Sequence, residues 1–318
     1  MSPMLTVSAS PHVHTGRTVS TCMWHVIIAL LPALACSIYF FGVGALIVTV
    51  TALLGCMATE YVVNRWMFGN PDATLANGSA ILTGLLLAFN LPSNLPVWIV
   101  LIGCVVAIGI GKMAFGGLGC NIWNPALVGR VFLLISFPVQ MTSWPVPLEN
   151  AWNYTDATTG ATTLGLLKLG EIQAADVNLA NQAIGYMGGS LGEVAAIALL
   201  IGFVYLLCVK VITWHIPVAV LGTVALFTLC LGDNVAVELL SGGLILGACF
   251  MATDYVTSPM SHKGMIVFGV LIGVITIVIR KWGAYPEGVS FAILLANSVV
   301  PLIDRYIKPR KFGERSKK

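Results

Sequence analysis

The sequence predicts an all-α membrane protein that crosses the bilayer many times. Of its 318 residues, 58% are hydrophobic and only 9% are charged, whereas soluble domains carry about 25% charged residues. Apolar runs that approach the roughly 20 residues of a bilayer span recur along the chain. The net charge of +3 reflects a short basic tail, so we expect a lipid environment and no nucleic-acid surface.

Breaks at Gly, Pro and polar residues divide the apolar sequence into ten predicted helices. The first five cover residues 21–41, 43–63, 75–91, 96–112 and 121–138. The second five cover residues 191–209, 211–231, 236–253, 264–281 and 288–307. Several of these runs are short for a straight crossing, so we expect broken or tilted segments among them.

A long polar segment separates the two sets of helices. The predicted organisation is an N-terminal segment (1–20), a first five-helix half (21–138), the polar segment (139–190), a second five-helix half (191–307) and a basic tail (308–318). Because each half holds an odd number of helices, a repeated half must be inverted in the membrane, as in many transporters. One constant offset along the chain relates Lys112 to Lys281, Gly119 to Gly288 and Gly78 to Gly247, and it favours such a repeat.

The distribution of basic residues predicts the orientation of the helices, because cytoplasmic loops are enriched in Lys and Arg. With a cytoplasmic N-terminus, twelve basic residues fall inside: Arg17, Arg65, Lys112, Lys210, Lys263 and the seven basic residues of 305–318. Only Lys168, Arg280 and Lys281 fall outside. We therefore expect both termini in the cytoplasm and the segment 139–190 on the extracytoplasmic side.

That polar segment contains the first candidate site. Five of the nine residues from 155 to 163 are Thr, and the stretch that begins at Asp156 and ends at Thr162 fits the pattern D-x-x-[ST]-G-A-T. The Thr162 hydroxyl, beside Ala161, is expected to be sterically open, and Gly160 lets the backbone bend sharply. The alternative interpretation is an unmodified polar turn.

This pattern resembles the flavinylation motif in membrane subunits of the Rnf electron-transport complex and of the sodium-pumping NADH:quinone reductase. Four more stretches are similar to signatures of the same family: NGSAILTGLLLAFNLP (77–92), GGLGCNIWNPALVGR (116–130), SGGLILGACFMATDYVTSP (241–259) and PEGVSFAILLANSVVPLID (286–304). The resemblance covers nearly the whole chain and favours the D subunit of Rnf over the B subunit of the reductase. It implies a fold similar to that of urea transporters.

The resemblance also implies two flavin cofactors. In the family, a flavin transferase joins FMN through its phosphate to the last Thr of the motif, which corresponds to Thr162. Asp156 would then orient the segment or contact the metal of the transferase. In the quinone reductases, a pair of Asn residues that matches Asn121 and Asn124 lies beside a noncovalent riboflavin.

The residues around this Asn pair suggest an irregular segment inside the membrane. Gly residues and Pro125 precede a membrane helix, and irregular backbone at membrane depth occurs only where protein or a cavity satisfies it. Asn121 and Asn124 are three residues apart, so on a helix they would share a face and could meet the pyrimidine edge of a flavin. The alternative is that they cap a broken helix. Arg130 would cost roughly 2.5–3.5 kcal/mol to insert near the bilayer centre, so it must face a carboxylate, carbonyl groups or an anionic cofactor.

Two carboxylates are candidates for an ion path. Asp254, near Thr253 and Thr257, could bind Na⁺ or relay protons through hard oxygen ligands. Glu60 is expected to end the second helix in a similar way. The alternative for both residues is a solvated helix end.

Taken together, the resemblance implies a flavoprotein subunit of a complex in the bacterial inner membrane. That complex moves electrons between ferredoxin and NAD, coupled to Na⁺ or H⁺ transport. Partners would supply NAD and iron–sulfur binding: other membrane subunits, an extracytoplasmic FMN carrier and a soluble NADH/ferredoxin module. No Rossmann motif or suitable Cys cluster is present here. The competing functions are a stand-alone channel or secondary transporter of urea-transporter-like fold, and a purely structural scaffold.

Overall fold

The computed structural model describes residues 18–69, 77–148, 154, 159–173, 177–194 and 196–308. Most of the N-terminal segment, most of the basic tail and Asp156 therefore lie outside the described residues. What the sequence predicts for them stays a prediction.

The described chain is largely helical, and its helices follow the predicted order. The first half contains α1 (Val19–Trp66), α2 (Ser79–Phe89), α3 (Val97–Val105), which continues as the π-helix η2 (Val106–Ile110), the 3-10 turn η3 (Met113–Phe115) and α4 (Pro125–Ser136). The second half contains α8 (Ala196–Cys208), α9 (His215–Leu231), α10 (Val235–Leu240), α11 (Leu244–Leu246), the π-helix η4 (Gly247–Met251), α12 (His262–Trp282) and α13 (Val289–Tyr306).

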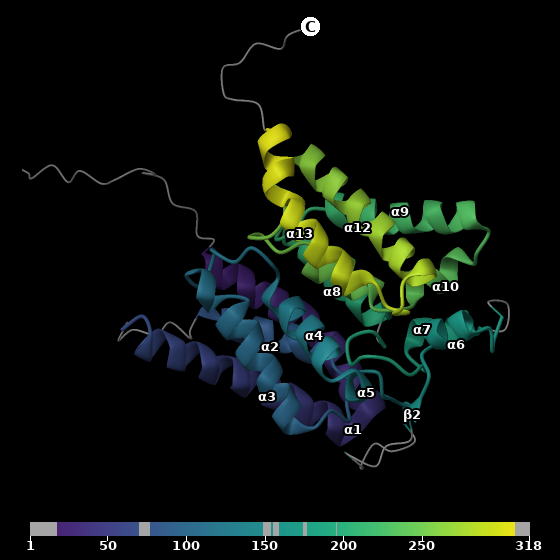
Figure 1. Cartoon of the computed structure of the whole chain (residues 1–318), viewed down its shortest axis with the longest axis horizontal. Coiled ribbons are helices and arrows are strands. Elements are labelled where there is room, and N and C mark those ends of the chain that lie inside the picture. The colour runs from purple at the N-terminus through teal and green to yellow at the C-terminus, as the bar shows by residue number, and fades with distance from the viewer. Residues whose placement is uncertain are drawn as a thin grey trace, which may run out of the picture.

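Element α1 is two helices joined at Gly42, where the sequence predicts a break between residues 41 and 43. Gly42 has φ 60° and ψ −131°, a conformation that interrupts the helical backbone and that residues with a side chain rarely adopt. Figure 1 shows the two parts of α1 running in opposite directions from this turn. The start of α1 and the end of α13 lie at one end of the bundle, whereas α6 and α7 lie toward the other.

One of the predicted spans is short and another is broken, in line with the expectation of broken or tilted segments. Helix α2 has only 11 residues, and the span predicted over 236–253 consists of α10, α11 and η4. Gly242 and Gly243, with φ of 71° and 63°, separate α10 from α11. Short helices of this kind end inside the protein, where their free backbone groups must be satisfied by neighbouring residues.

The helix starts do not support the offset that matches Gly78 with Gly247. Helices α2 and α11 both begin after a left-handed glycine, which is Gly78 in the first half and Gly243 in the second. Helices α4 and α13 begin after Asn124 and Gly288. The number of residues between these two positions is also smaller than the predicted offset. Gly247, in contrast, lies inside η4. The register proposed from the Lys and Gly matches is therefore wrong at these helix starts.

The polar segment 139–190 contains short elements that no periodicity in the sequence predicts. These are α5 (Pro138–Met141), β1 (Trp144–Pro145), β2 (Thr159–Gly160), α6 (Thr163–Leu169) and α7 (Leu179–Ile184). The two strands pair antiparallel, with Trp144 opposite Gly160 and Pro145 opposite Thr159. This pairing joins the two ends of the stretch that carries the Thr-rich motif.

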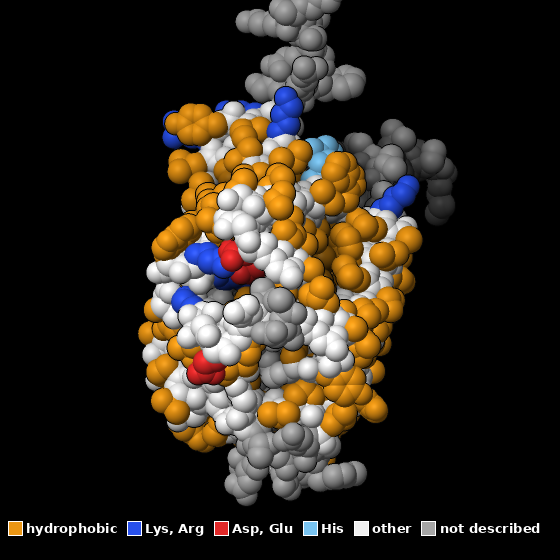
Figure 2. All heavy atoms as spheres, turned by 90° about the vertical axis from the view of Figure 1, so that its right-hand side faces the viewer, with side chains coloured by type: hydrophobic (Ala, Val, Ile, Leu, Met, Phe, Trp, Pro, Cys, Tyr) orange, Lys and Arg blue, Asp and Glu red, His pale blue; other side chains and the backbone are white. Residues whose placement is uncertain are grey.

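The surface and helix lengths are those of an integral membrane protein. Among the described residues, four helical spans are long and apolar enough to cross a bilayer: Val19–Trp66, Val97–Phe115, His262–Trp282 and Val289–Tyr306. Four shorter apolar helices accompany them. Large apolar side chains such as Leu54, Ile201 and Leu226 are more than half exposed, and apolar side chains cover the flanks of the molecule in Figure 2. The chain is therefore an all-α membrane protein.

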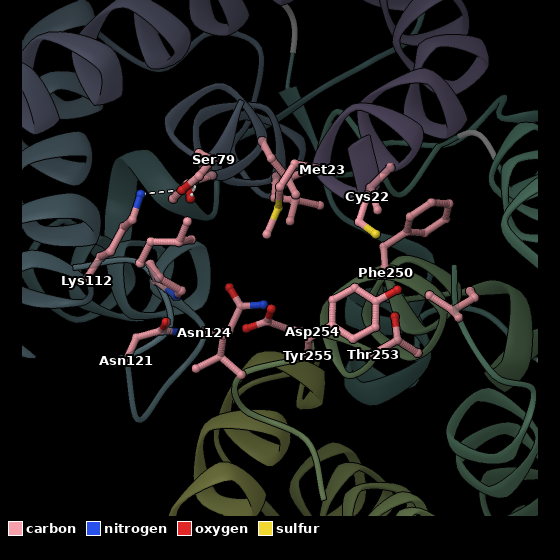
Figure 3. A pocket seen from close by; sticks show the side chains of 18 of the residues that line it. Cys22, Met23, Ser79, Lys112, Asn121, Asn124, Phe250, Thr253, Asp254 and Tyr255 are labelled. Atoms are coloured by element: carbon pink, nitrogen blue, oxygen red, sulfur yellow. Dashed lines mark hydrogen bonds between the residues drawn. The ribbon is translucent and has the colours of Figure 1, made fainter. Parts of the chain in front are cut away.

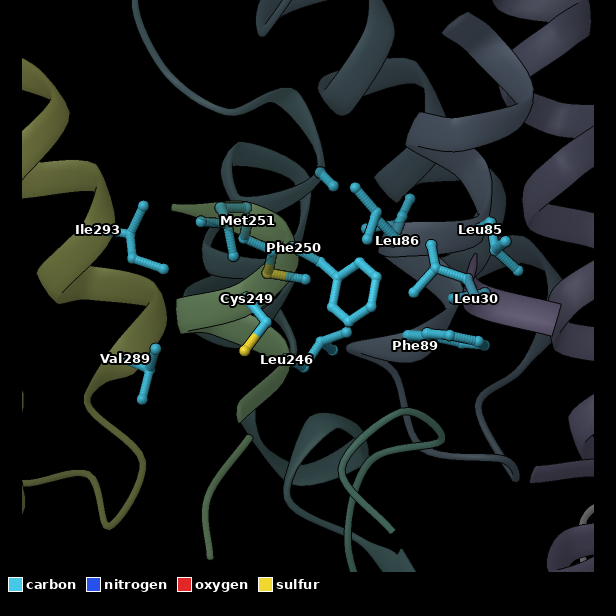
Figure 4. Packing of buried hydrophobic residues seen from close by; sticks show 14 of the residues in the cluster. Leu30, Leu85, Leu86, Phe89, Leu246, Cys249, Phe250, Met251, Val289 and Ile293 are labelled. Carbon is cyan, nitrogen blue, oxygen red and sulfur yellow. The ribbon is translucent and has the colours of Figure 1, made fainter. Parts of the chain in front are cut away.

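The core lies where the short helices of the two halves meet. Figure 4 shows Phe89 and Leu86 of α2 facing Leu246 and Phe250 of the second half, with Val289 of α13 on the opposite side of the segment that carries Leu246 and Phe250. Phe89 and Leu87 are fully buried. The segment between α7 and α8 passes through this junction, where Gly192 N donates to Phe89 O (2.8 Å) and Leu191 N donates to Leu91 O (3.1 Å). These bonds satisfy the carbonyl groups at the end of α2.

Candidate functional site

A pocket near one end of the bundle contains the last Thr of the motif, and we name it the Thr162 pocket. It encloses about 690 Å³ of empty space, open solvent at its mouth included. Its walls come from α4, from the β1 strand, from the start of α6 and from the loop before α13. The residues that line it include Arg130, Leu134, Met141, Trp144, Tyr285 and Glu287.

Thr162 is the N-cap of α6. Its Oγ1 accepts a hydrogen bond from Gly165 N at 3.1 Å, and the residue is only 5% exposed. The expectation that this hydroxyl is sterically open is therefore wrong for the folded chain. Gly165 keeps space beside it, because a Cβ at that position would lie 3.2 Å from the Thr162 Oγ1. Gly160 lies in β2, and Ala161 lines the pocket together with Thr162.

The loop before α13 is held against α6 by Lys168. Its ammonium group donates to the carbonyl groups of Gly283 and Tyr285. Partial burial lowers the pKa of Lys168. These contacts keep Tyr285 and Glu287 close to the first turn of α6, and so they form one side of the Thr162 pocket.

Arg130 reaches the same pocket from α4 and finds the partner that its burial requires. The guanidinium forms an ion pair with Glu287, and its Nη1 donates to Asn90 Oδ1 at 2.7 Å and to Ser290 Oγ at 2.8 Å. Arg130 is 6% exposed. A carboxylate, one of the alternatives that the sequence left open, is therefore among its partners.

A second carboxylate, Glu193, lies behind this pair. Glu193 is 5% exposed and accepts hydrogen bonds from Ser190 N and Ser190 Oγ, both at 3.3 Å. The charges of Glu287 and Arg130 both act on it. The buried group therefore contains two carboxylates and one guanidinium.

A second pocket lies toward the other end of the bundle and contains the predicted Asn pair; we name it the Asn124 pocket. It encloses about 780 Å³ of empty space, open solvent at its mouth included. Figure 3 shows Asn121, Asn124 and Asp254 pointing into it from one side, with Lys112 and Cys22 farther around the wall. The remaining wall is mostly apolar, as in typical small-molecule sites.

The two amides do not share a helical face, because α4 begins at Pro125. Asn124 is its N-cap: the Oδ1 accepts from Ala126 N (3.1 Å), and the Nδ2 donates to Met251 O (3.2 Å). Asn121 lies before the helix, donates to Trp123 O (3.0 Å) and hydrogen bonds to Asp254. The capping interpretation is confirmed for Asn124, and both side chains nevertheless line the pocket.

The two carboxylates proposed for an ion path differ in their surroundings. Glu60 lies inside α1, is 4% exposed and accepts a salt bridge from Lys112 Nζ at 2.6 Å; Lys112 also donates to Ser79 Oγ. The interpretation of Glu60 as a solvated helix end is therefore wrong. Asp254 follows η4, is half-buried and accepts from Thr257 Oγ1 at 3.2 Å. Both Asp254 and Lys112 line the Asn124 pocket.

A short chain of contacts joins the two pockets. Asn90, at the end of α2, accepts from Arg130 and donates to Met251 Sδ at 3.7 Å. The carbonyl group of the same Met251 accepts from Asn124. Asn90 and Met251 are both buried. The contact chain Arg130–Asn90–Met251–Asn124 therefore crosses the core where the two halves meet.

Sequence reasoning missed several residues of these sites. Asn90, Glu193 and Glu287 had no predicted role, and Lys112 was used only for the orientation and the repeat. Asn90 and Glu287 nevertheless lie in quoted stretches. A buried charge in an apolar sequence is a signal in itself, and it could have directed attention to these positions. Their pairing with Glu60 and Arg130 depends on the tertiary fold.

Comparison with known proteins identifies the family of this chain and several relatives. A family model described as the NQR2, RnfD, RnfE family matches residues 6–313. The chain belongs to this family. It is 46% identical over 312 residues to the D subunit of the Na⁺-translocating ferredoxin:NAD⁺ oxidoreductase complex of Acetobacterium woodii, covering 97% of this chain and 95% of that protein.

Two further relatives of this NQR2, RnfD, RnfE family member have similar coverage. The D subunit of the proton-translocating ferredoxin:NAD⁺ oxidoreductase complex of Clostridium ljungdahlii is 42% identical over 326 residues, covering 98% of this chain and 97% of that protein. The D subunit of the ion-translocating oxidoreductase complex of Stutzerimonas stutzeri is 41% identical, covering 94% of each chain. The names of the first two relatives differ in the ion.

Proposed function

We propose that this chain is the D-type membrane subunit of an Rnf ion-translocating ferredoxin:NAD oxidoreductase and carries two flavins. The observation that supports this most is the position of Thr162, which the flavinylation motif singles out and which lies in the wall of a mostly apolar pocket. As part of an oxidoreductase, the chain would relay electrons and would have no complete activity alone.

The Thr162 pocket fits a flavin that is attached to the Thr162 oxygen. The pocket has Thr162 and Ala161 of the motif in its wall. Leu134, Met141 and Trp144 offer an apolar wall for a planar ring. FMN would supply the electron-transfer chemistry, while the chain holds the ring and excludes water from it.

Attachment to Thr162 requires that the hydroxyl leave its buried position. The Thr162 Oγ1 caps α6 and is shielded in the folded chain, so the flavin transferase must act while the first turn of α6 is displaced. Gly165 favours the modified state, since a side chain there would crowd the ester oxygen.

The Asn124 pocket is the proposed riboflavin site. Asn121 and Asn124 place two amides on its wall beside Asp254, and the rest of the wall is mostly apolar. Amide donors and acceptors suit the polar edge of a flavin, and apolar residues suit its ring faces. Because Asp254 and the Glu60–Lys112 pair border the same space, the candidate ion path and this flavin site would be neighbours.

The proposed topology has ten crossings in two inverted halves, with a fold similar to that of urea transporters. The paired starts of α2 and α11 and of α4 and α13 support it. Both termini would then be cytoplasmic in the bacterial inner membrane, and Thr162 would be extracytoplasmic. The partners would be the other Rnf subunits, including an extracytoplasmic FMN carrier and a soluble NADH/ferredoxin module.

We expect the Thr162→Val variant to lose its covalent flavin completely while it still inserts into the membrane. The reason is that Val keeps the shape of Thr but has no oxygen to bond phosphate. Wild-type and variant chains, made together with the flavin transferase, are denatured, separated on a gel and examined for flavin fluorescence. The same denatured samples are analysed by mass spectrometry for released riboflavin, which both chains should contain.

Thr163→Val is the matched control, because it removes the neighbouring hydroxyl and should keep the fluorescent band. A band that survives Thr162→Val would move the attachment site. A wild-type chain without any bound flavin would favour the channel or transporter function, for which the two pockets between inverted halves would also be suitable.

A further inference from the structure

The charged part of the Thr162 pocket consists of one ion pair in an otherwise uncharged wall. Among the described residues that line this pocket, Arg130 and Glu287 carry the only charges. Their side chains are 7% and 11% exposed. In such surroundings water screens little, so each charge acts on a bound group more strongly than it would at the surface.

The guanidinium of Arg130 is fixed in place. It is held by Asn90 at 2.7 Å, by Ser290 at 2.8 Å and by the ion pair with Glu287. These contacts come from the end of α2, the first turn of α13 and the loop before α13. Arg130 therefore presents its charge to the pocket from one position.

The ion pair does not satisfy both oxygens of Glu287. One oxygen of Glu287 bonds to Arg130, whereas its Oε1 is buried and has no hydrogen-bond partner among the described residues. A second acidic side chain, Glu193, lies buried behind the pair. Another buried cation of the second half, Arg280, is already paired with Glu238 at 2.7 Å. The wall thus contains one positive and one negative charge at different positions, and each can act on a bound group from its own side.

We propose that Arg130 and Glu287 tune the reduction potential of a flavin on Thr162 in opposite directions, Arg130 raising it and Glu287 lowering it. This inference rests on the proposed function. Reduction adds negative charge to a flavin ring, so a nearby cation stabilises the reduced form and a nearby carboxylate destabilises it. Asn90 and Ser290 act as positioning residues, because they touch Arg130 and do not line the pocket.

The test is a spectroscopic redox titration of the purified complex with Arg130→Gln, Glu287→Gln or both substitutions in this chain. We expect the potential of the covalent flavin to fall in Arg130→Gln, to rise in Glu287→Gln and to return toward the wild-type value in the double variant. Shifts of the reduction potential in opposite directions are decisive, because a merely structural disturbance of the pocket would shift the potential of both single variants in the same direction.

Lys281→Gln is the matched control for removing a cation near this end of the bundle. Lys281 is 31% exposed in its side chain and pairs with Asp233 at 2.6 Å and, at 3.6 Å, with Glu238; because it is partly exposed, water and salt screen its charge. Its removal should leave the potential unchanged. A shift as large as that of Arg130→Gln would show that net charge, and not the wall of the pocket, sets the potential.

Arg130→Gln leaves the buried Glu287 carboxylate without its partner, so its yield is expected to fall. Glu287→Gln keeps Arg130 beside Glu193, and the double variant removes both charges of the pair, so these two variants keep the test decisive. An unchanged or lowered potential in Glu287→Gln, with full covalent flavin on a gel, would overturn this inference alone. Absence of flavin from the wild-type chain would instead overturn the proposed function.

Discussion

Lys112→Met should destabilise the folded protein by about 3–5 kcal/mol, because it leaves the Glu60 carboxylate buried without its partner. Lys112 and Glu60 are 2% and 4% exposed, and their atoms approach to 2.6 Å. Lys112 also bonds Ser79 at the start of α2. The variant therefore removes a link between α1, α2 and the end of η2, which together form one side of the Asn124 pocket. Reversible unfolding of the purified protein in a denaturing detergent measures the loss.

The double variant Lys112→Met/Glu60→Met should recover most of that stability, since buried ion pairs replaced by apolar residues of similar size are often neutral or better. The control is Lys281→Met, whose partly exposed pair with Asp233 should contribute no more than about 1 kcal/mol. If Lys112→Met lost no more stability than Lys281→Met, the Lys112–Glu60 pair would not hold α1 and α2 together as described.

Gly202→Val should cost about 3 kcal/mol or more, because a side chain at this position overpacks the contact between the two halves. A Cβ on Gly202 of α8 would lie 2.1 Å from the backbone O of Ala29 in α1 and 3.2 Å from the ring of Phe250. Backbone atoms cannot rotate away, so α1 and α8 would have to separate. Small residues permit such close approach of membrane helices. The same detergent unfolding assay measures the change.

Gly222→Val is the matched control on the neighbouring helix α9, since a Cβ there meets nothing within 4 Å. It should leave stability close to the wild-type value. Equal losses in the two variants would mean that the substitution acts through helix propensity, not through the contact of α8 with α1.

Much of the fold could be predicted because a bilayer imposes simple rules on sequence. The break at Gly42 was predicted, and the short α2 and the interrupted span over 236–253 fit the general expectation of broken segments, although no interruption at Gly242 and Gly243 was predicted. The short elements of 139–190 were not predicted, because α6 and α7 have seven and six residues, too few for a helical period to stand out. The register between the halves was misplaced for a related reason: isolated Lys and Gly identities recur by chance in such a composition.

For the candidate sites too, features of neighbouring residues could be predicted and features of the tertiary fold could not. The motif at Thr162 and the amides at Asn121 and Asn124 could be recognised from neighbouring residues alone. That Thr162 is buried as a helix cap, and that Asn121 lies outside the helix, could not, since both facts depend on where a helix begins in three dimensions.

By itself, the sequence determined that this chain must lie in a membrane and which short stretches carry its chemistry, because hydropathy and local motifs are properties of adjacent residues. Only the tertiary structure decided which charges meet. Arg130 pairs with Glu287 and Lys112 with Glu60, 157 and 52 residues apart. The physical reason is that a buried charge must find an opposite one, and the packing of the half-helices, not their order in the chain, determines which one lies within reach.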